Sequence, residues 1–168
     1  IGREDSDRFA FSSQQKYARA RAEGYYAEEL LTVEVPAERR KDPPLQVRED
    51  EHPRADTTPE SLARLKPLQK DGVVTAGNAS GINDGAGALL IGTREMGQKL
   101  GLKPRARIVA GAVAGVEPRI MGLGPVPATQ KVLQRAGLQL KDIDVLELNE
   151  AFATQVLGCL KLLQVPFD

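Results

Sequence analysis

The chain has 168 residues, which is enough for one domain or two small ones. It is 41% hydrophobic, and its 23 basic residues balance 23 acidic ones, so the net charge is zero. A neutral chain with 4% aromatic residues and no Trp is not expected to bind nucleic acid or an anionic membrane surface. Its single cysteine excludes an internal disulfide and a cysteine-based zinc site.

The first part of the chain predicts helices joined by long polar segments. Residues 2–23 predict an amphipathic helix with Gly2 as its N-cap, because apolar side chains recur there at helical spacing. Residues 30–35 predict a strand, and a Pro-rich loop follows it with a short strand at 45–47. A second helix is expected to begin after its N-cap Thr58 and to end before Pro67.

Beyond residue 80 the pattern changes to short apolar runs that alternate with amphipathic segments. The runs that predict strands are residues 86–91, 106–116 and 143–148. The segments that predict helices are the one capped by Thr93 and residues 126–136 and 150–164. Because residues 106–116 are nearly all small and apolar, that strand is expected to be buried on both faces. This rhythm predicts an α/β fold in which helices cover a sheet with parallel strands.

Three loops contain the most unusual local compositions. They read TAGNASGINDG at residues 75–85, MGLGPVP at 121–127 and NEAFA at 149–153. The first has few bulky side chains, so its backbone can approach a long, thin ligand closely. The third lies where a predicted strand meets a predicted helix, a common place for functional groups in α/β proteins.

Each loop also has a purely structural interpretation. The 75–85 segment can be a turn-rich connection, and Met121 can fill a gap in the core. Asn149 can be the N-cap of the helix that follows. His52 has the pattern of a solvated loop histidine, and Cys159 lies on an apolar stripe that favours a buried hydrophobic role over a nucleophilic one.

The three loops, in this order, resemble the thiolases. The matching phrases are VTAGNASGINDGA at residues 74–86, IMGLGPVPAT at 120–129 and NEAFA at 149–153. The likeness runs over essentially the whole chain. The phrase DEHPRADTT at 50–58 is most similar to bacterial 3-oxoadipyl-CoA thiolases and their acetyl-CoA acyltransferase relatives.

The resemblance implies a partial thiolase fold, which is an α/β fold with αβαβα layers. Residues 1–78 are expected to form most of the loop domain that covers CoA. Residues 79–103 are expected to be the last strand and helix of the N-terminal half, and residues 104–168 the first part of the C-terminal half. The resemblance also implies a cytoplasmic homodimer or homotetramer, with missing thiolase segments or another copy of the chain as partners.

The implied reaction is acyl transfer between a 3-oxoacyl-CoA and CoA, giving acetyl-CoA and a shortened acyl-CoA, or the reverse condensation. The family uses a nucleophilic cysteine, a histidine and a second cysteine, whose motifs belong before residue 1 and after residue 168; Cys159 matches neither cysteine. We therefore expect a middle piece of a thiolase that is inactive by itself. A non-catalytic CoA-binding or scaffold fragment is the alternative.

The same resemblance assigns site residues one by one. Asn149 is expected to hold the water of an oxyanion hole, and Met121 and Phe152 to line the acyl cavity. The side chains expected to contact CoA are Ala76 and Ser80 at the pantetheine arm, and Arg54, Ser61 and Leu65 at the adenosine and 3′-phosphate. CoA and acyl-CoA are expected as substrates, with no metal and no permanently bound cofactor.

Two incomplete halves have a structural consequence. Strands that belong to different halves cannot pair with each other, so their edges and faces lack partners within the chain. We therefore expect exposed apolar surface around residues 86–91 and 106–116.

Overall fold

The computed structural model describes residues 1–37, 39 and 41–167. The chain divides into two compact units. The first comprises Ile1–Gly81 together with Ala151–Thr154, and the second comprises Ile82–Glu150 together with Gln155–Asp168. Among the described helices, none combines the length and apolar character that crossing a bilayer requires.

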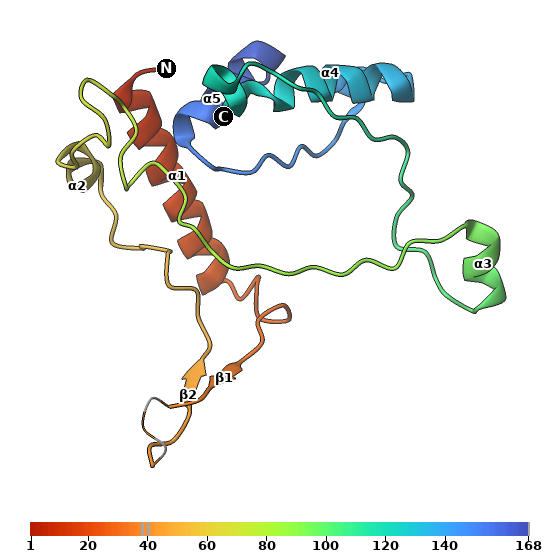
Figure 1. The fold of residues 1–168 in the computed structure, drawn as a ribbon, viewed down its shortest axis with the longest axis horizontal. Coiled ribbons are helices and arrows are strands. Elements are labelled where there is room, and N and C mark those ends of the chain that lie inside the picture. Colours follow the sequence, from red (N-terminus) through yellow and green to blue (C-terminus); the bar gives the residue numbers. More distant parts are fainter. Residues whose placement is uncertain (38, 40, 168) are drawn as a thin grey trace. The chain divides into compact units, whose positions relative to one another are not determined.

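The first unit is built on the long helix α1, Arg3–Ala22 (Figure 1). Its N-cap is Gly2, as predicted, and the Gly2 N–H donates to Oδ2 of Asp5 at 3.4 Å. The chain leaves the helix through Gly24, whose φ of 75° is a conformation that glycine adopts without strain. The helix predicted at residues 2–23 is therefore confirmed.

A two-stranded antiparallel hairpin follows, formed by β1, Val33–Val35, and β2, Leu45–Val47. Val33 pairs with Val47 and Val35 with Leu45, so the apolar side chains share one face of the hairpin. The strand predicted at residues 30–35 is shortened to its last three residues, whereas the strand at residues 45–47 is confirmed.

The short helix α2, Pro59–Ala63, packs against α1. Thr58 caps it as predicted: the Ser61 N–H donates to Oγ1 of Thr58 at 3.1 Å. Leu62 is the buried residue of this helix. The helix ends several residues earlier than the position of Pro67 alone predicts.

The second unit begins with α3, Arg94–Lys99, whose N-cap Thr93 accepts from the Met96 N–H at 3.2 Å. The 3₁₀ helix η1, Pro118–Leu123, leads into α4, Pro125–Ala136. α4 ends at Gly137, whose φ is 67°. These helices confirm the two predicted from Thr93 and at residues 126–136.

The remaining elements of the second half of the chain are the 3₁₀ helix η2, Leu140–Asp142, and the helix α5, Ala153–Leu163. The predicted helix at residues 150–164 is confirmed in its position, but it starts three residues later than expected. Val156 and Cys159 are the buried residues of its inward stripe.

The strands predicted at residues 86–91, 106–116 and 143–148 are wrong for the described part of the second unit, where these runs pair with no strand. Figure 1 shows the first two as extended trace. The parallel sheet expected from the rhythm of the sequence is likewise absent from the described residues. The physical reason is that a strand needs neighbours to satisfy its N–H and C=O groups, and none lies beside these runs.

Residues 106–116 nevertheless keep the pattern of a strand with one covered face. Ala112 and Ala114 are half-buried, whereas the intervening Val113 is 83% exposed. Two carbonyls of the run accept hydrogen bonds from side chains of α4: Lys131 donates to the Val113 oxygen at 3.2 Å and Arg135 to the Gly111 oxygen at 2.7 Å.

The expected exposure of apolar surface is confirmed. Leu89 and Leu90 are 88% and 89% exposed, and Ile91, Ile108 and Val109 are also exposed. Isolated apolar residues on a surface are common, but contiguous runs of this kind mark a surface that another polypeptide covers.

We therefore predict that the isolated 168-residue chain binds 1-anilinonaphthalene-8-sulfonate strongly, because the dye enhances its emission on exposed apolar surface. Fluorescence titration measures the binding, with a folded protein of similar size as the control. A chain that leaves the dye dark and melts cooperatively as a monomer would show that these runs find cover within the chain.

Candidate functional site

The loop that resembles the pantetheine-contacting segment is shaped by one buried amide side chain, that of Asn78. Its Oδ1 accepts from the Thr75 N–H at 2.8 Å, and its Nδ2 donates to the Val73 carbonyl at 2.9 Å. Asn78 is 4% exposed and Thr75 is fully buried. Because these bonds replace those of regular secondary structure, they fix the course of the loop without a helix or strand.

The second donor hydrogen of Asn78 reaches α1, where Nδ2 donates to Oδ1 of Asp7 at 2.9 Å. The other carboxylate oxygen of Asp7 accepts from Nε of Arg3 at 2.7 Å. Asp7 is also buried, so both its oxygens and the Asn78 amide are satisfied inside the unit. The loop is thereby attached to α1 through a charge-assisted pair.

The same guanidinium holds the end of α2. Nη2 of Arg3 donates to the carbonyl of Leu62 at 2.6 Å and to that of Leu65 at 3.0 Å. Carbonyls at a helix C-terminus lack partners within the helix and carry its negative end, so a guanidinium suits them. Arg3 therefore connects α1, α2 and, through Asp7, the loop.

Sequence reasoning gave these scaffold residues no role. Asn78 follows Thr75 by three residues, which is a local signal for a side-chain turn. Its partner Asp7 lies 71 residues away, and no local pattern connects the two.

Two glycines let the loop lie flat on its neighbours. A Cβ atom at Gly77 would come within 2.5 Å of methyl groups of Leu62 and Leu65. A Cβ atom at Gly81 would collide with the imidazole ring of His52. The loop backbone thus lies against both α2 and the segment that carries His52, and side chains at these two positions would separate them.

The first unit also brings the NEAFA segment to the same loop. The Ser80 N–H donates to the Ala151 carbonyl at 2.9 Å, and the Ala153 N–H donates to the Asn78 carbonyl at 2.9 Å. An isolated antiparallel bridge joins Ala79 and Phe152. The predicted site residues Ser80 and Phe152 are therefore neighbours, and both side chains are exposed.

Ala76 and Leu65 lie on the same part of the first unit. Both are exposed, and Gly77, next to Ala76, is the residue that packs on Leu65. Four of the predicted residues, namely Leu65, Ala76, Ser80 and Phe152, are thus arranged along one loop whose backbone the buried network fixes.

Ser61 has a structural task of its own. Its hydroxyl donates to the Thr58 carbonyl at 2.8 Å and accepts from the Thr58 N–H at 3.0 Å. A phosphate oxygen can only accept, so Ser61 Oγ would have to leave the cap in order to bind one. Nearby, hydrogen bonds from its own backbone N–H and from the Thr58 hydroxyl lower the pKa of Glu60.

The second unit carries Asn149 and Met121. Asn149 is exposed, and α5 begins only at Ala153, so the interpretation of Asn149 as the N-cap of this helix is wrong. Met121, in η1, is 74% exposed, so the interpretation that it fills a core gap is also wrong. The structural alternatives therefore account for neither side chain.

Cys159 behaves as the apolar-stripe pattern predicts. It is fully buried on α5, its Sγ lies 3.3 Å from the Gly122 carbonyl, and Nε2 of Gln155 lies 3.6 Å from the sulfur. His52 is an exposed loop residue, as expected. Within the described ranges, no group of three or more His, Cys, Asp or Glu side chains could hold a metal ion.

Comparison with known proteins identifies two family matches. The N-terminal domain family of thiolases matches residues 1–95, and the C-terminal domain family of thiolases matches residues 102–168. Together they cover nearly all of the chain.

Similar proteins of known name are about two and a half times as long as this chain. The 3-oxoadipyl-CoA/3-oxo-5,6-dehydrosuberyl-CoA thiolase of Escherichia coli is 56% identical over the whole chain, which spans 42% of that relative. A beta-ketoadipyl-CoA thiolase of Acinetobacter baylyi is 53% identical with the same coverage. A probable acetyl-CoA acyltransferase of Staphylococcus epidermidis is 48% identical, again with 42% of its length spanned.

Solved structures match the fold. The acetyl-CoA acetyltransferase of Bacillus anthracis has a TM-score of 0.90 and 47% identity over 99% of this chain and 42% of its own. Human mitochondrial 3-ketoacyl-CoA thiolase in complex with CoA has a TM-score of 0.86 and 44% identity over 99% of this chain and 40% of its own. The partial thiolase fold predicted from the sequence is confirmed.

The Escherichia coli relative allows the site to be tested in a complete enzyme. We call the chimera the protein in which residues 1–168 replace the matching segment of that relative. In the chimera, Asn78→Ala should accelerate amide hydrogen exchange of residues 73–80 by about 10- to 100-fold, because it leaves buried partners unpaired.

Mass spectrometry of peptides from the exchanged chimera measures this effect, and Asn83→Ala, at an exposed asparagine, is the matched control. Equal exchange in the two variants would show that Asn78 does not determine the order of the loop.

Proposed function

Because the chain belongs to the thiolase family, we propose that it acts as the CoA-holding part of an acyltransferase. The reaction is the cleavage of a 3-oxoacyl-CoA by CoA to acetyl-CoA and a shortened acyl-CoA, or its reverse. The chain spans about two fifths of its relatives. Its own contribution is therefore the binding and orientation of the thioester rather than the covalent chemistry.

The observation that carries the proposal is the preformed small-residue loop at residues 75–81. Its backbone is held by buried hydrogen bonds, while Ala76 and Ser80 stay exposed on it. A pantetheine arm is narrow and bears amides, so it suits a surface with little side-chain bulk and with backbone polar groups close by. A loop that is rigid before the ligand arrives loses less entropy on binding.

The proposed adenosine end lies on the neighbouring elements. Leu65, at the end of α2, offers an apolar surface to the adenine, and the exposed Arg54 offers a guanidinium to the 3′-phosphate. Ser61 takes a smaller part than the resemblance alone implies, because its hydroxyl proton already serves the cap of α2.

At the acyl end, Phe152 and Met121 are proposed to line the cavity, and Asn149 to hold the water of an oxyanion hole. Exposure of all three supports a role toward a ligand rather than toward the core. A water held by a fixed amide can donate to the thioester oxygen as negative charge develops on it.

The proposed acyl group is the 3-oxoadipyl group. Relatives named for 3-oxoadipyl-CoA or beta-ketoadipyl-CoA are 53–56% identical to this chain. CoA and acyl-CoA are substrates in this scheme, and the complete protein is proposed to be a cytoplasmic homodimer or homotetramer. No observation favours a non-catalytic scaffold instead.

We predict that the chimera thiolyses 3-oxoadipyl-CoA and that Arg54→Ala raises its KM for CoA by about 10-fold, the effect of losing one charge-assisted hydrogen bond. Initial rates at varied CoA measure this, and the same titration with 3′-dephospho-CoA is the control. An equal rise for both ligands would remove the phosphate from the assignment.

For Asn149→Asp in the chimera we predict that kcat falls by about 10- to 10³-fold, the range for losing one oxyanion-hole donor. The aspartate keeps the size of the side chain but lacks the amide donor. Thermal unfolding should change little, because Asn149 is exposed and caps no helix. Wild-type turnover in this variant would exclude Asn149 from the reaction.

A further inference from the structure

One face of α1 holds the segment that leads to Arg54. Oε1 of Gln14 accepts from the Arg54 N–H at 2.8 Å, and the Tyr17 hydroxyl donates to Oδ2 of Asp50 at 3.1 Å. A third contact joins Arg21 to Glu49, with 2.5 Å between Nη2 and Oε1.

The three helix residues form a stripe. Positions 14, 17 and 21 are spaced by three and four residues, so their side chains project from the same side of α1. Their partners run in the opposite direction along the chain, from residue 54 back to residue 49. Residues 49–54 are therefore laid antiparallel along the helix, and we call them the docked segment.

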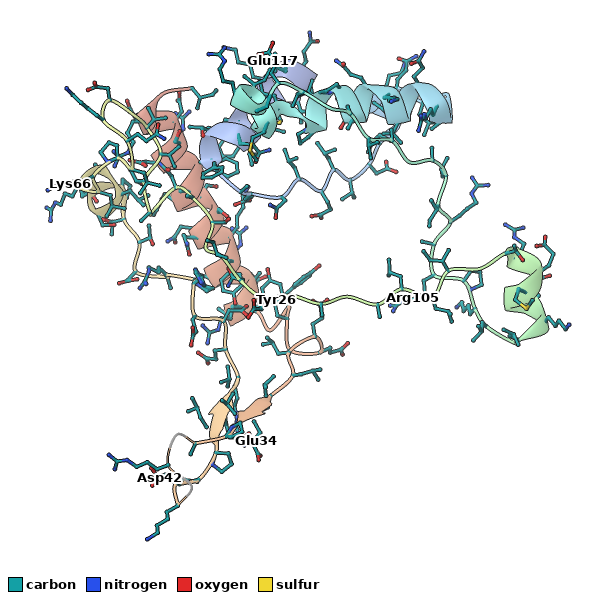
Figure 2. The ribbon with its side chains drawn as sticks, in the orientation of Figure 1. Tyr26, Glu34, Asp42, Lys66, Arg105 and Glu117 are labelled. Atoms are coloured by element: carbon teal, nitrogen blue, oxygen red, sulfur yellow. The ribbon has the colours of Figure 1, made fainter. Side chains whose placement is uncertain are left out.

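Tyr17 is the most strongly embedded member of the stripe. Its ring stacks on that of Tyr26, with 5.3 Å between centroids, and Tyr25 packs edge-on against Tyr26 at the same centroid distance. Tyr26, labelled in Figure 2, lies just beyond the C-terminal end of α1. Burial and the hydrogen bond to Asp50 raise the pKa of the Tyr17 phenol above 10, so it remains a donor at neutral pH.

The docked segment is also fixed against the loop at residues 75–81. The ring of His52 occupies the space beside Gly81 that a Cβ atom would fill. At the end of the segment, the Arg54 carbonyl accepts from the Thr57 N–H at 3.1 Å. Both backbone polar groups of Arg54 are thus occupied, while its side chain is exposed and forms no ion pair with any carboxylate of the described residues.

We infer that Gln14 and Tyr17 are positioning residues that fix the backbone of Arg54 so that its guanidinium meets the 3′-phosphate of CoA. The inference rests on the function proposed above. A guanidinium on a fixed backbone has fewer arrangements to lose when it binds phosphate than one on a free loop. The stripe therefore acts on CoA affinity through Arg54 and has no contact with the ligand itself.

Arg21 has the smallest share. The side chains of Arg21 and Glu49 are 45% and 66% exposed, and an ion pair in that setting contributes little after screening by solvent. The test therefore removes the two hydrogen bonds of Gln14 and Tyr17 and leaves Arg21 in place.

The experiment measures dissociation constants of CoA and 3′-dephospho-CoA by calorimetry on the chimera. The variant Gln14→Met/Tyr17→Phe keeps the size of both side chains but lacks the two hydrogen bonds. We expect its Kd for CoA to rise by about 3- to 30-fold, from the net contribution of one to two hydrogen bonds. Its Kd for 3′-dephospho-CoA should change by less than about twofold, because that ligand does not use Arg54.

The decisive arm adds Arg54→Ala. If the stripe acts through Arg54, Gln14→Met/Tyr17→Phe raises the Kd for CoA no further in that background. The matched control is Tyr25→Phe, which removes the hydroxyl of an exposed tyrosine and keeps its ring contact with Tyr26. It should leave both constants unchanged.

The outcomes separate the inference from the proposed function. If Arg54→Ala weakens CoA selectively but Gln14→Met/Tyr17→Phe does not, the stripe has no positioning role and only the inference fails. Equal weakening of both ligands, or an additive effect on top of Arg54→Ala, also overturns it by indicating general damage to the unit. If Arg54→Ala does not distinguish the two ligands, the proposed phosphate contact itself is wrong and the inference falls with it.

Discussion

The order of the first unit depends on the buried hydrogen bond between the side chains of Asp7 and Asn78. Asp7 belongs to α1 and Asn78 to the loop, so this one bond joins segments that are distant in sequence. Arg3 extends the connection to the end of α2. A buried carboxylate is costly unless it is paired and hydrogen-bonded, and here both of its oxygens are occupied, so the network stabilises one arrangement of the three segments.

The two units differ in how their polar backbone groups are satisfied. In the first, a loop without regular structure is held by side chains such as Asn78, and its exposed residues are small. In the second, the apolar runs at residues 86–91 and 106–116 are extended but unpaired, and their side chains face solvent. The first unit thus carries a finished surface for a ligand, and the second carries surface suited to contact with further polypeptide.

Local signals predicted the helices well. Gly2, Thr58, Thr93 and Gly137 lie at helix ends as expected, because a cap depends on residues only a few positions away. The strands at 86–91, 106–116 and 143–148 were wrong because pairing depends on neighbours that local composition does not show. The resemblance placed Ser80 and Phe152 in one family site, and the structure makes them neighbours, but the link from Asp7 to Asn78 required the folded chain.

The measurement that tests this account most directly is a double-mutant cycle between Asp7→Ala and Asn78→Ala in the chimera. The free energy of local opening is read from amide exchange at Thr75 and Ala153, whose N–H groups donate to Asn78. The account predicts a coupling energy of about 1–3 kcal/mol, as found for residues within one buried network. Effects that add within about 0.5 kcal/mol would contradict it, because the loop would then keep its shape without α1.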